Sequence, residues 1–430
     1  MPTHAELLAR HKEVLPSWLA LYYSEPISLV RGDGRRVWDA EGKEYLDFFG
    51  GILTTMTGYN IPEVTEAVQQ QAARIMHSST LYLIEAQIEL AEKIAGLSGI
   101  PNAKVFFTNS GTEANDAAMM LSTINRQSNQ ILALRNSYHG RSFAAVSLTG
   151  NRSWSPTALS PLAVIYIHNG YKYRSPFGHL PDDEFIAACV ADLRDMIDVG
   201  TAGDVAAMIA EPIQGVGGFT TPPDGFFGAF KEVLDEHGIL FISDEVQTGW
   251  GRTGENFWGY QAHDLTPDII TFAKGVGNGL AMGGVIARAD VMDSINANSI
   301  STFGGNPLAT AGALANIDYL IEHDLQTNSL KVGNQLKSRL DHLADEEGSI
   351  VGDVRGKGLQ IGVELVKPGT KDPDPETTTK IMENAKDNGL LIGKGGLYGN
   401  VLRIAPPLSL TEAEADEGFE MLEKAIEDAG

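Results

Sequence analysis

The sequence predicts an α/β fold built on a mostly parallel sheet that helices cover on both faces. From about residue 60 to residue 310, short apolar runs alternate with stretches of helical spacing. The apolar runs are nearly continuous, as expected of strands that are buried on both faces. They begin at residues 103, 130, 205, 238 and 268, in "AKVFFTNSG", "QILALRNSYHG", "VAAMIAEPIQG", "GILFISDEVQTG" and "DIITFAKG".

The two ends of the chain predict a second, smaller α+β part. A helix comes first, and turn-rich "RGDG" and "DAEGK" then separate short β-like runs at residues 27–51, which predicts a small meander. Strand-like pieces at 352–366 and 400–410 flank a helical stretch at 377–389. Thr411 and Glu414 have the capping-box spacing that opens a last helix. We expect a small domain formed by residues 1–55 and 316–430, and a large α/β domain formed by residues 56–315.

The composition is that of a globular protein with a strong negative charge. Of its 430 residues, 43% are hydrophobic and 20% charged, and the formal net charge is −24. This charge disfavours non-specific binding to nucleic acid or anionic membranes. No apolar stretch is long enough for a membrane helix, and the start lacks the layout of a secretory signal. One cysteine, Cys189, excludes an intramolecular disulfide, and scattered histidines give no metal-binding spacing. We therefore expect a cytoplasmic protein without a metal site.

Polar residues or glycines end each of the five predicted strands. They occupy positions 109–111, 138–140, 211–212, 244–245 and 274–275. In open α/β sheets the ligand site lies beyond the carboxyl ends of the strands. The sequence therefore predicts one site that these five segments share.

A lysine and an aspartate in these segments predict the chemistry of the site. Lys274 follows an apolar strand, where desolvation lowers the pKa of an amine and makes it a usable nucleophile. Asp244 ends another apolar strand, where a carboxylate needs a cationic partner. A pyridinium nitrogen meets that need, and a lysine with such an acid is typical of pyridoxal 5′-phosphate (PLP) sites. Taken singly, Lys274 is equally compatible with a surface loop, and Asp244 with a helix cap.

A phosphate site and a stacking ring are predicted nearby. Ser110, Gly111 and Thr112 form a short turn directly before a helix, where main-chain N–H groups and the helix dipole favour an anion. Tyr138 follows the next strand and is placed to stack on an aromatic ring, although a core position explains a lone tyrosine as well. These segments together predict a PLP enzyme.

Six motifs resemble those of class-III aminotransferases, the ω-amino-acid branch of PLP fold type I. They are "SGTEAND", "YHG", "EPIQG", "DEVQTGWGRTG", "DIITFAKGVGNG" and "STFGGNPLA", in the order typical of that family. The resemblance runs from about residue 22 to the end and is closest to the type-2 alanine–glyoxylate and 3-aminoisobutyrate–pyruvate group. It implies a seven-stranded, mostly parallel sheet in a large domain, with a small α+β domain formed from both termini.

The resemblance also implies a role for each matched residue. Lys274 corresponds to the residue that forms the internal aldimine and moves the proton between Cα and C4′. Asp244 corresponds to the acid that keeps the ring nitrogen protonated, and Gln247 to the donor for the ring oxygen. Thr302 corresponds to a threonine that the second subunit contributes to the phosphate, which implies a homodimer with shared sites, or a tetramer of two dimers. The other implied cofactor contacts are Ser110, Gly111, Thr112, Tyr138, His139, Glu211 and Val246.

Arg403 matches the arginine that binds the substrate carboxylate in this family. In the ornithine and GABA branches, an acid two residues after the glutamine of "EPIQG" pairs with that arginine, whereas Val216 stands there in this chain. We therefore expect an enzyme that moves an amino group from an ω- or β-amino acid or alanine to pyruvate or glyoxylate by a ping-pong mechanism. The expected pocket wall consists of Tyr22, Ile52, Leu53 and Tyr82.

Three positions in two motifs depart from the family pattern, and other functions remain open. The family's "GHxHP" is "GYNIP" here, with Tyr59 and Ile61 in place of histidines, and Ser301 replaces the histidine before Thr302. The alternatives within enzymes are a PLP lyase acting on an amino-alcohol phosphate, an aminomutase and a broad amine–pyruvate transaminase. A non-catalytic PLP-fold binding protein is disfavoured by the intact lysine and aspartate. A nucleotide-binding protein is disfavoured because neither GxGxxG nor a Walker motif is present.

Overall fold

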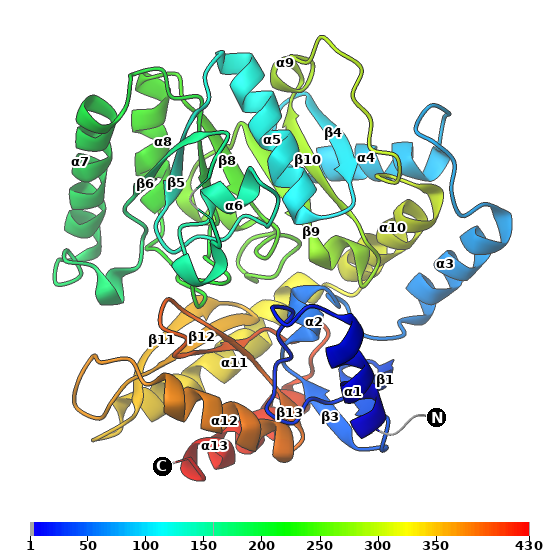
Figure 1. Cartoon of the computed structure of the whole chain (residues 1–430), viewed down its shortest axis with the longest axis vertical. Coiled ribbons are helices and arrows are strands. Elements are labelled where there is room, and N and C mark those ends of the chain that lie inside the picture. The colour runs from blue at the N-terminus through cyan, green and yellow to red at the C-terminus, as the bar shows by residue number, and fades with distance from the viewer. Residues whose placement is uncertain (1–3, 158, 430) are drawn as a thin grey trace.

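The computed structural model describes residues 4–157 and 159–429, and a seven-stranded mixed sheet lies in its upper half in Figure 1. The strand order is β4-β10-β9-β8-β7-β5-β6. Strands β5 to β9 pair in parallel, and β10 runs antiparallel to β4 and β9. The predicted mostly parallel, seven-stranded sheet is thus confirmed. The strands are β4 (Ala103–Thr108), β5 (Gln130–Leu134), β6 (Ala163–Ile167), β7 (Ala207–Ala210), β8 (Leu240–Asp244), β9 (Ile269–Ala273) and β10 (Gly283–Arg288).

Helices cover both faces of this sheet, which explains why its central strands are apolar without alternation. Leu132, Met208 and Phe241 pack with helices α7 (Asp182–Gly200) and α8 (Phe226–Glu236). Their strand neighbours Ile131, Ile209 and Ile242 pack with α5 (Gly111–Arg126) on the other face. Successive side chains of a strand point to opposite faces, so both must be apolar when both faces are covered. The further helices of this part are α3 (Pro62–Arg74), α4 (Glu85–Leu97), α6 (Ala145–Leu148), α9 (Ala289–Met292) and α10 (Pro307–Glu322).

Two four-stranded sheets form the lower half of the molecule in Figure 1, where both ends of the chain also lie. The predicted meander is confirmed as antiparallel β1 (Leu29–Asp33), β2 (Arg36–Asp39) and β3 (Glu44–Asp47). Strand β13 (Leu390–Leu391) pairs in parallel with β3 and so joins the two ends of the chain. The other sheet has the order β11-β12-β15-β14. Its strands are β11 (Val351–Lys357), β12 (Gln360–Leu365), β15 (Val401–Ile404) and β14 (Gly393–Gly395).

Helices α1 (His4–Val14), α11 (Leu325–Asp345), α12 (Pro375–Asp387) and α13 (Glu412–Glu427) accompany these sheets. The predicted capping box is present, since Thr411 accepts from the Glu414 amide and Glu414 accepts from the Thr411 amide. One apolar cluster contains Phe48, Ile270 and Leu402, which belong to the N-terminal segment, the large sheet and the C-terminal segment. The division of the chain at residues 55 and 315 remains a prediction.

Two strands of the large sheet, β6 and β10, were not among the predicted ones. Strand β10 begins with Gly283 and Gly284, residues that are rare in strands, and it reverses the direction of its neighbours. At Gly284 a β-carbon would lie 2.5 Å from the Phe272 ring of β9, so close packing explains the glycine. Within residues 4–157 and 159–429, no helix is both long and apolar enough to span a membrane.

Candidate active site

A cavity of about 390 Å³ opens at the carboxyl ends of the parallel strands. Its walls come from the segments that follow β5, β7, β8 and β9, together with the start of α5. All the predicted cofactor contacts except Thr302 lie in these walls. They are Ser110, Gly111, Thr112, Tyr138, His139, Glu211, Asp244, Val246, Gln247 and Lys274.

Lys274 turns the chain sharply out of β9 and is largely buried. Its φ of +49° lies in the left-handed region, which costs a non-glycine residue roughly 1–3 kcal/mol and persists where the surroundings enforce it. Burial, reinforced by the positive charge of Arg403, lowers the pKa of the amine to about 8, although Asp244 and Glu211 act in the opposite direction. Near neutral pH an appreciable fraction of this amine is therefore uncharged and nucleophilic.

This lowered pKa predicts the pH dependence of cofactor uptake by the cofactor-free protein. Only the neutral amine attacks an aldehyde, and the neutral fraction rises as pH increases through the pKa of Lys274. We expect the rate of PLP incorporation to rise with pH, with a midpoint at the pKa of Lys274, about 8. An ordinary lysine amine would give a midpoint near 10.5. Stopped-flow absorbance during reconstitution measures this midpoint. In Arg403→Gln the midpoint moves upward, because a neighbouring positive charge is removed.

Asp244 lies at the end of β8, where three neighbours hold its carboxylate. Its Oδ2 accepts from Asn115 Nδ2 at 2.8 Å and lies 2.7 Å from His139 Nδ1, while Oδ1 accepts from the Val246 amide at 3.2 Å. Within the described residues this carboxylate has no ion pair with a lysine or arginine. A buried carboxylate is costly without a cation, so the site is suited to a positively charged ring nitrogen.

The start of α5 forms the anion-binding end of the cavity. Ser110 is its N-cap, and its hydroxyl accepts from the Glu113 amide at 3.2 Å. The first amides of a helix have no acceptor within the helix and bind anions, a preference that the helix dipole reinforces. At Gly111 a β-carbon would lie 3.0 Å from Val246, so glycine lets the two segments approach. Thr112 links the turn to the next segment by accepting from the Arg141 amide at 3.3 Å.

Glu211 connects two walls of the cavity. Its carboxylate accepts from the Tyr138 amide and from the Gly215 amide, both at 2.8 Å. Burial raises the pKa of Glu211 to about 7; the nearby His139 opposes this shift and Asp244 adds to it. Gly215 in turn lies under Gln247, since a β-carbon there would be 2.2 Å from its Nε2. Glu211 thus fixes the segments that carry Tyr138 and support Gln247.

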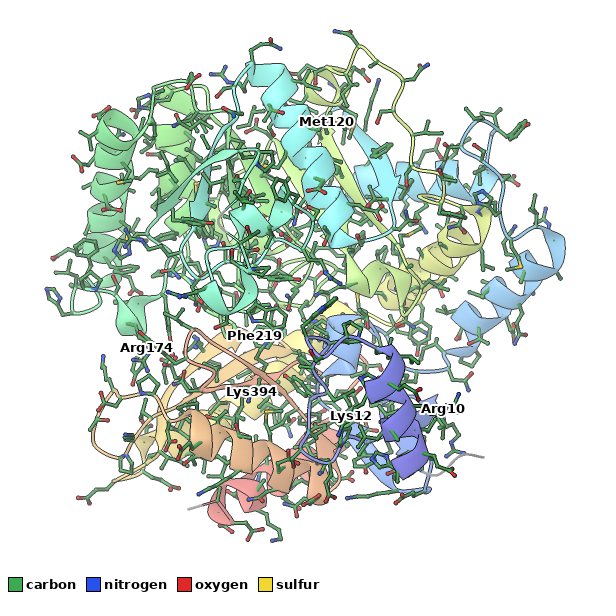
Figure 2. All side chains as sticks on the ribbon, viewed as in Figure 1. Arg10, Lys12, Met120, Arg174, Phe219 and Lys394 are labelled. Carbon is green, nitrogen blue, oxygen red and sulfur yellow. The ribbon has the colours of Figure 1, made fainter. Side chains whose placement is uncertain are left out.

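Arg403, on β15, does not itself line the cavity but contacts Gln247 of its wall from the lower half of the molecule. Its Nη2 donates to Gln247 Oε1 at 2.8 Å, and its guanidinium lies over the rings of Phe219 at 4.5 Å and Phe49 at 5.2 Å. Phe219 lies where the upper and lower halves meet (Figure 2). A guanidinium has only donors, so the Gln247 oxygen must face it, which leaves the Gln247 amide nitrogen to donate elsewhere. Burial lowers the pKa of Arg403 to about 10, so the group stays charged at neutral pH.

Of the other predicted residues, Leu53 and Tyr22 contact the aromatic rings beside Arg403, whereas Tyr82 and Thr302 do not line the cavity. Leu53 is buried with Phe219, next to Thr54 of the cavity wall. Tyr22 stacks on Phe49 at 5.7 Å, and its hydroxyl donates to the main-chain oxygen of Lys394, a residue labelled in Figure 2. Tyr82 is 71% exposed and, like the exposed Thr302, does not line the cavity of the chain that carries it.

Sequence reasoning missed some of the cavity residues. Asn115, which binds both Asp244 and the main-chain oxygen of His139, lies one helical turn after Gly111. Asn115 could have been found from the four-residue spacing that places residues on one face of a helix, because Gly111 had already been assigned to the site. Asn109 and Gly140, which also line the cavity, lie in the strand-end segments predicted to share the site, whereas Thr54, Ala273, Leu280, Ala281 and Met282 were not predicted.

The sheet and the cavity together define a PLP enzyme of fold type I. A helix start suited to a phosphate, a buried carboxylate without a lysine or arginine partner and a largely buried lysine with a lowered pKa share one cavity. Phosphate, protonated ring nitrogen and aldehyde are the groups of PLP that these residues match.

The chain belongs to the class-III aminotransferase family, whose model, described as "Aminotransferase class-III", matches residues 22–426. Enzymes of this family depend on PLP. The chain is 40% identical over 417 residues to alanine–glyoxylate aminotransferase 2 homolog 2, mitochondrial, from Arabidopsis thaliana, covering 96% of this chain and 86% of that protein. It is 38% identical over 439 residues to an alanine/serine racemase from Pyrococcus horikoshii, covering 99% of this chain and 91% of that protein.

Solved structures agree with this assignment. A thermostable (S)-enantioselective omega-transaminase from Thermomicrobium roseum superposes with a TM-score of 0.91 at 34% identity, covering 100% of this chain and 99% of that one. An amine transaminase from an uncultivated Pseudomonas species, in its PLP-bound form, gives a TM-score of 0.91 at 31% identity, covering 97% and 98%. The chain is therefore a PLP-dependent aminotransferase by family and by fold.

Proposed function

We propose that this enzyme transfers an amino group from alanine or a β- or ω-amino acid to a small α-keto acid such as pyruvate or glyoxylate. The observation that carries this proposal is Arg403, a buried and charged guanidinium that contacts Gln247 of the cavity wall. Within the described residues it has no carboxylate partner, and its Nε has no hydrogen-bond acceptor. A substrate carboxylate supplies the acceptor that this fork of donors lacks.

The segment around Val216 supports a small monocarboxylate acceptor. Val216 is buried, and its main-chain oxygen accepts from the Gly396 amide at 2.9 Å. An acid at position 216 would lie close to Arg403. The main chain at Val216 packs on β14 beside this arginine, because a β-carbon on Gly395 would meet both the Arg403 side chain and the Val216 oxygen. Because valine carries no charge, Arg403 keeps its binding capacity for a substrate.

The residues of the cavity divide the work of the reaction. When bound, PLP supplies an electron sink for the charge that remains after a proton leaves the substrate's Cα. Lys274 anchors the cofactor and, once free, moves the proton at Cα. Asp244 holds the ring nitrogen protonated, with Asn115 and His139 fixing its carboxylate. The other proposed cofactor contacts are Ser110, Gly111, Thr112, Tyr138, Glu211, Val246 and Gln247. Donor and acceptor use the same cavity in turn, which is a ping-pong order.

Several relatives support the choice of substrates and one competing reaction. Alanine–glyoxylate aminotransferase 2 from Homo sapiens is 36% identical over 451 residues. An alanine/serine racemase and a leucine/methionine racemase, each 38% identical to this chain, make racemisation of an amino acid the second candidate. A racemase returns the same amino group to its substrate and needs no keto acid, so dependence of turnover on a keto acid separates the two reactions.

A homodimer with shared sites fits the residues that do not reach the cavity of their own chain. Thr302 and Tyr82 are exposed, and Tyr82 lies between the exposed apolar residues Leu81 and Leu83. Such surface is typical of an interface. We propose that the second subunit places these two residues at the site. We also propose a cytoplasmic enzyme with a large domain at 56–315 and a small domain formed by 1–55 and 316–430.

Arg403→Gln tests the assignment of the carboxylate site. We expect the KM for pyruvate or glyoxylate to rise about 10- to 100-fold, because a hydrogen bond to a charged group contributes about 1.5–3 kcal/mol. Steady-state kinetics with L-alanine or β-alanine as donor measure this rise, and the cofactor's visible band confirms that the variant still holds PLP. An unchanged KM for both keto acids would contradict the assignment.

A further inference from the structure

The strained turn that follows β3 carries one wall of the carboxylate site. In α2 (Gly50–Leu53) all four residues have φ between +54° and +66°, so the chain makes one left-handed helical turn. Two of them, Ile52 and Leu53, are not glycines, and each costs roughly 1–3 kcal/mol in this conformation. A turn of this kind persists only where its surroundings determine it, so its contacts identify what positions it.

The turn is linked to Arg403 on both sides. Phe49, directly before it, lies under the Arg403 guanidinium at 5.2 Å, and Leu53 packs with Phe219, the other ring against that guanidinium. The Ala405 amide, two residues after Arg403, donates to the Phe48 oxygen at 2.7 Å. A movement of the turn therefore shifts the two aromatic rings that pack against the Arg403 guanidinium.

Asp47 holds the start of this turn. Its Oδ1 accepts from the Phe49 amide at 2.8 Å and from the Gly50 amide at 3.0 Å. Asp47 is only 3% exposed and forms no ion pair among the described residues. Its other oxygen, Oδ2, accepts from the Tyr59 hydroxyl at 2.6 Å. That hydroxyl is thus the side-chain donor that balances a buried, unpaired carboxylate, and burial raises the pKa of Asp47 accordingly.

Tyr59 is itself fixed by close packing. Its amide donates to the Gly34 oxygen at 2.7 Å, and the Gly34 amide donates back to Tyr59 at 2.9 Å. Gly32 makes room for the ring, since a β-carbon there would lie 2.5 Å from Tyr59 Cδ1. Tyr59 belongs to "GYNIP", which is "GHxHP" in the family pattern. Tyr59 does not line the cavity, so contact with cofactor or substrate does not explain this tyrosine.

We propose that Tyr59 is a positioning residue for substrate selection: through Asp47 it holds the left-handed turn Gly50–Leu53 in place, and the turn sets the position of Arg403 for the substrate carboxylate. This inference rests on the proposed function of Arg403. Tyr59 touches neither substrate nor cofactor. Its hydroxyl is a neutral donor to a charged acceptor, a bond that is stronger than one between neutral groups.

Tyr59→Phe in the holoenzyme tests this role, because it removes the hydroxyl and keeps the ring. We expect the KM for pyruvate to rise about tenfold, because part of the free energy of the lost Tyr59–Asp47 bond is transmitted through the turn to Arg403, with kcat and the cofactor's visible band unchanged. Tyr45→Phe is the matched control. Tyr45 lies on β3, the strand that ends at Asp47, and donates to the Asp39 carboxylate at 2.8 Å. Asp39, however, binds the amides of Glu41 and Lys43 in a hairpin away from the cavity. This control lowers the melting temperature without changing the KM.

A double variant shows whether Tyr59 acts through Arg403. In the Arg403→Gln background, Tyr59→Phe should add nothing to the KM, because coupled residues are not additive. A KM in Tyr59→Phe equal to that of the wild type, or an equal rise in both backgrounds, would overturn the inference. If Arg403→Gln alone leaves the KM unchanged, the proposed function itself is wrong, whatever the KM of Tyr59→Phe. Should Tyr59→Phe not fold, Tyr59→His serves in its place: its ring ends nearer the main chain, and the same rise in KM is expected.

Discussion

Replacing Lys274 by alanine is expected to lower the rate of amino transfer by about 10⁴-fold or more. Proton transfer by a positioned side chain contributes roughly 10²–10⁴-fold by itself, and the covalent anchor is lost with the same amine. The lowered pKa and the left-handed backbone at Lys274 support this role. Steady-state turnover of L-alanine with pyruvate measures the loss.

Lys331→Ala is the control for this variant. Lys331 is exposed on α11 and pairs with Glu412 at the surface, far along the chain from the strand ends. Its replacement should leave turnover unchanged, since an exposed ion pair contributes little to stability. Turnover of Lys274→Ala within tenfold of the wild type would contradict the role assigned to the lysine.

Replacing Asp244 by asparagine is expected to lower kcat by about 10²–10³-fold, the usual effect of removing one preorganised electrostatic group. Asparagine keeps the shape of the side chain and an oxygen that accepts from Asn115, but it loses the charge that holds the ring nitrogen protonated. The variant should still bind PLP through Lys274. Single-turnover kinetics with an amino donor measure the chemical step separately from binding.

Asp268→Asn is the matched control for the charge at Asp244. Asp268 is also buried, but it precedes β9 at the opposite end of the sheet, where it pairs with Arg288 and accepts from the Phe241 amide. Its replacement should lower the melting temperature, because it removes the buried charge that pairs with Arg288, and should leave kcat unchanged. An equal kcat for Asp244→Asn and the wild type would contradict the electrostatic role assigned to Asp244.

The strand ends and their polar residues were predictable because the relevant information is local. An apolar run followed by Lys274 or Asp244 defines both a strand and the place where its side chain emerges, and parallel strands bring such ends to one edge of the sheet. The same reasoning missed β10, where the glycines that allow close packing weaken the strand pattern.

The features that escaped prediction depend on contacts between distant segments. Gln247 and Arg403 meet across 156 positions of the sequence, and no local pattern indicates that contact. The left-handed turn at Gly50–Leu53 contains Ile52, a β-branched residue that disfavours positive φ, so its conformation comes from Asp47 and the packing of Leu53 rather than from propensity. Tertiary contacts decide both features.

The central claim is that Lys274 holds PLP in a transaminase that shuttles between amino and keto substrates, and a visible titration of the wild type beside Lys274→Ala tests it most directly. The account predicts that L-alanine, β-alanine or 3-aminoisobutyrate bleaches the band of the lysine-bound cofactor and that pyruvate or glyoxylate restores it. It also predicts that Lys274→Ala lacks that band. A wild-type band that no donor bleaches, or the same cycle in Lys274→Ala, would contradict the account.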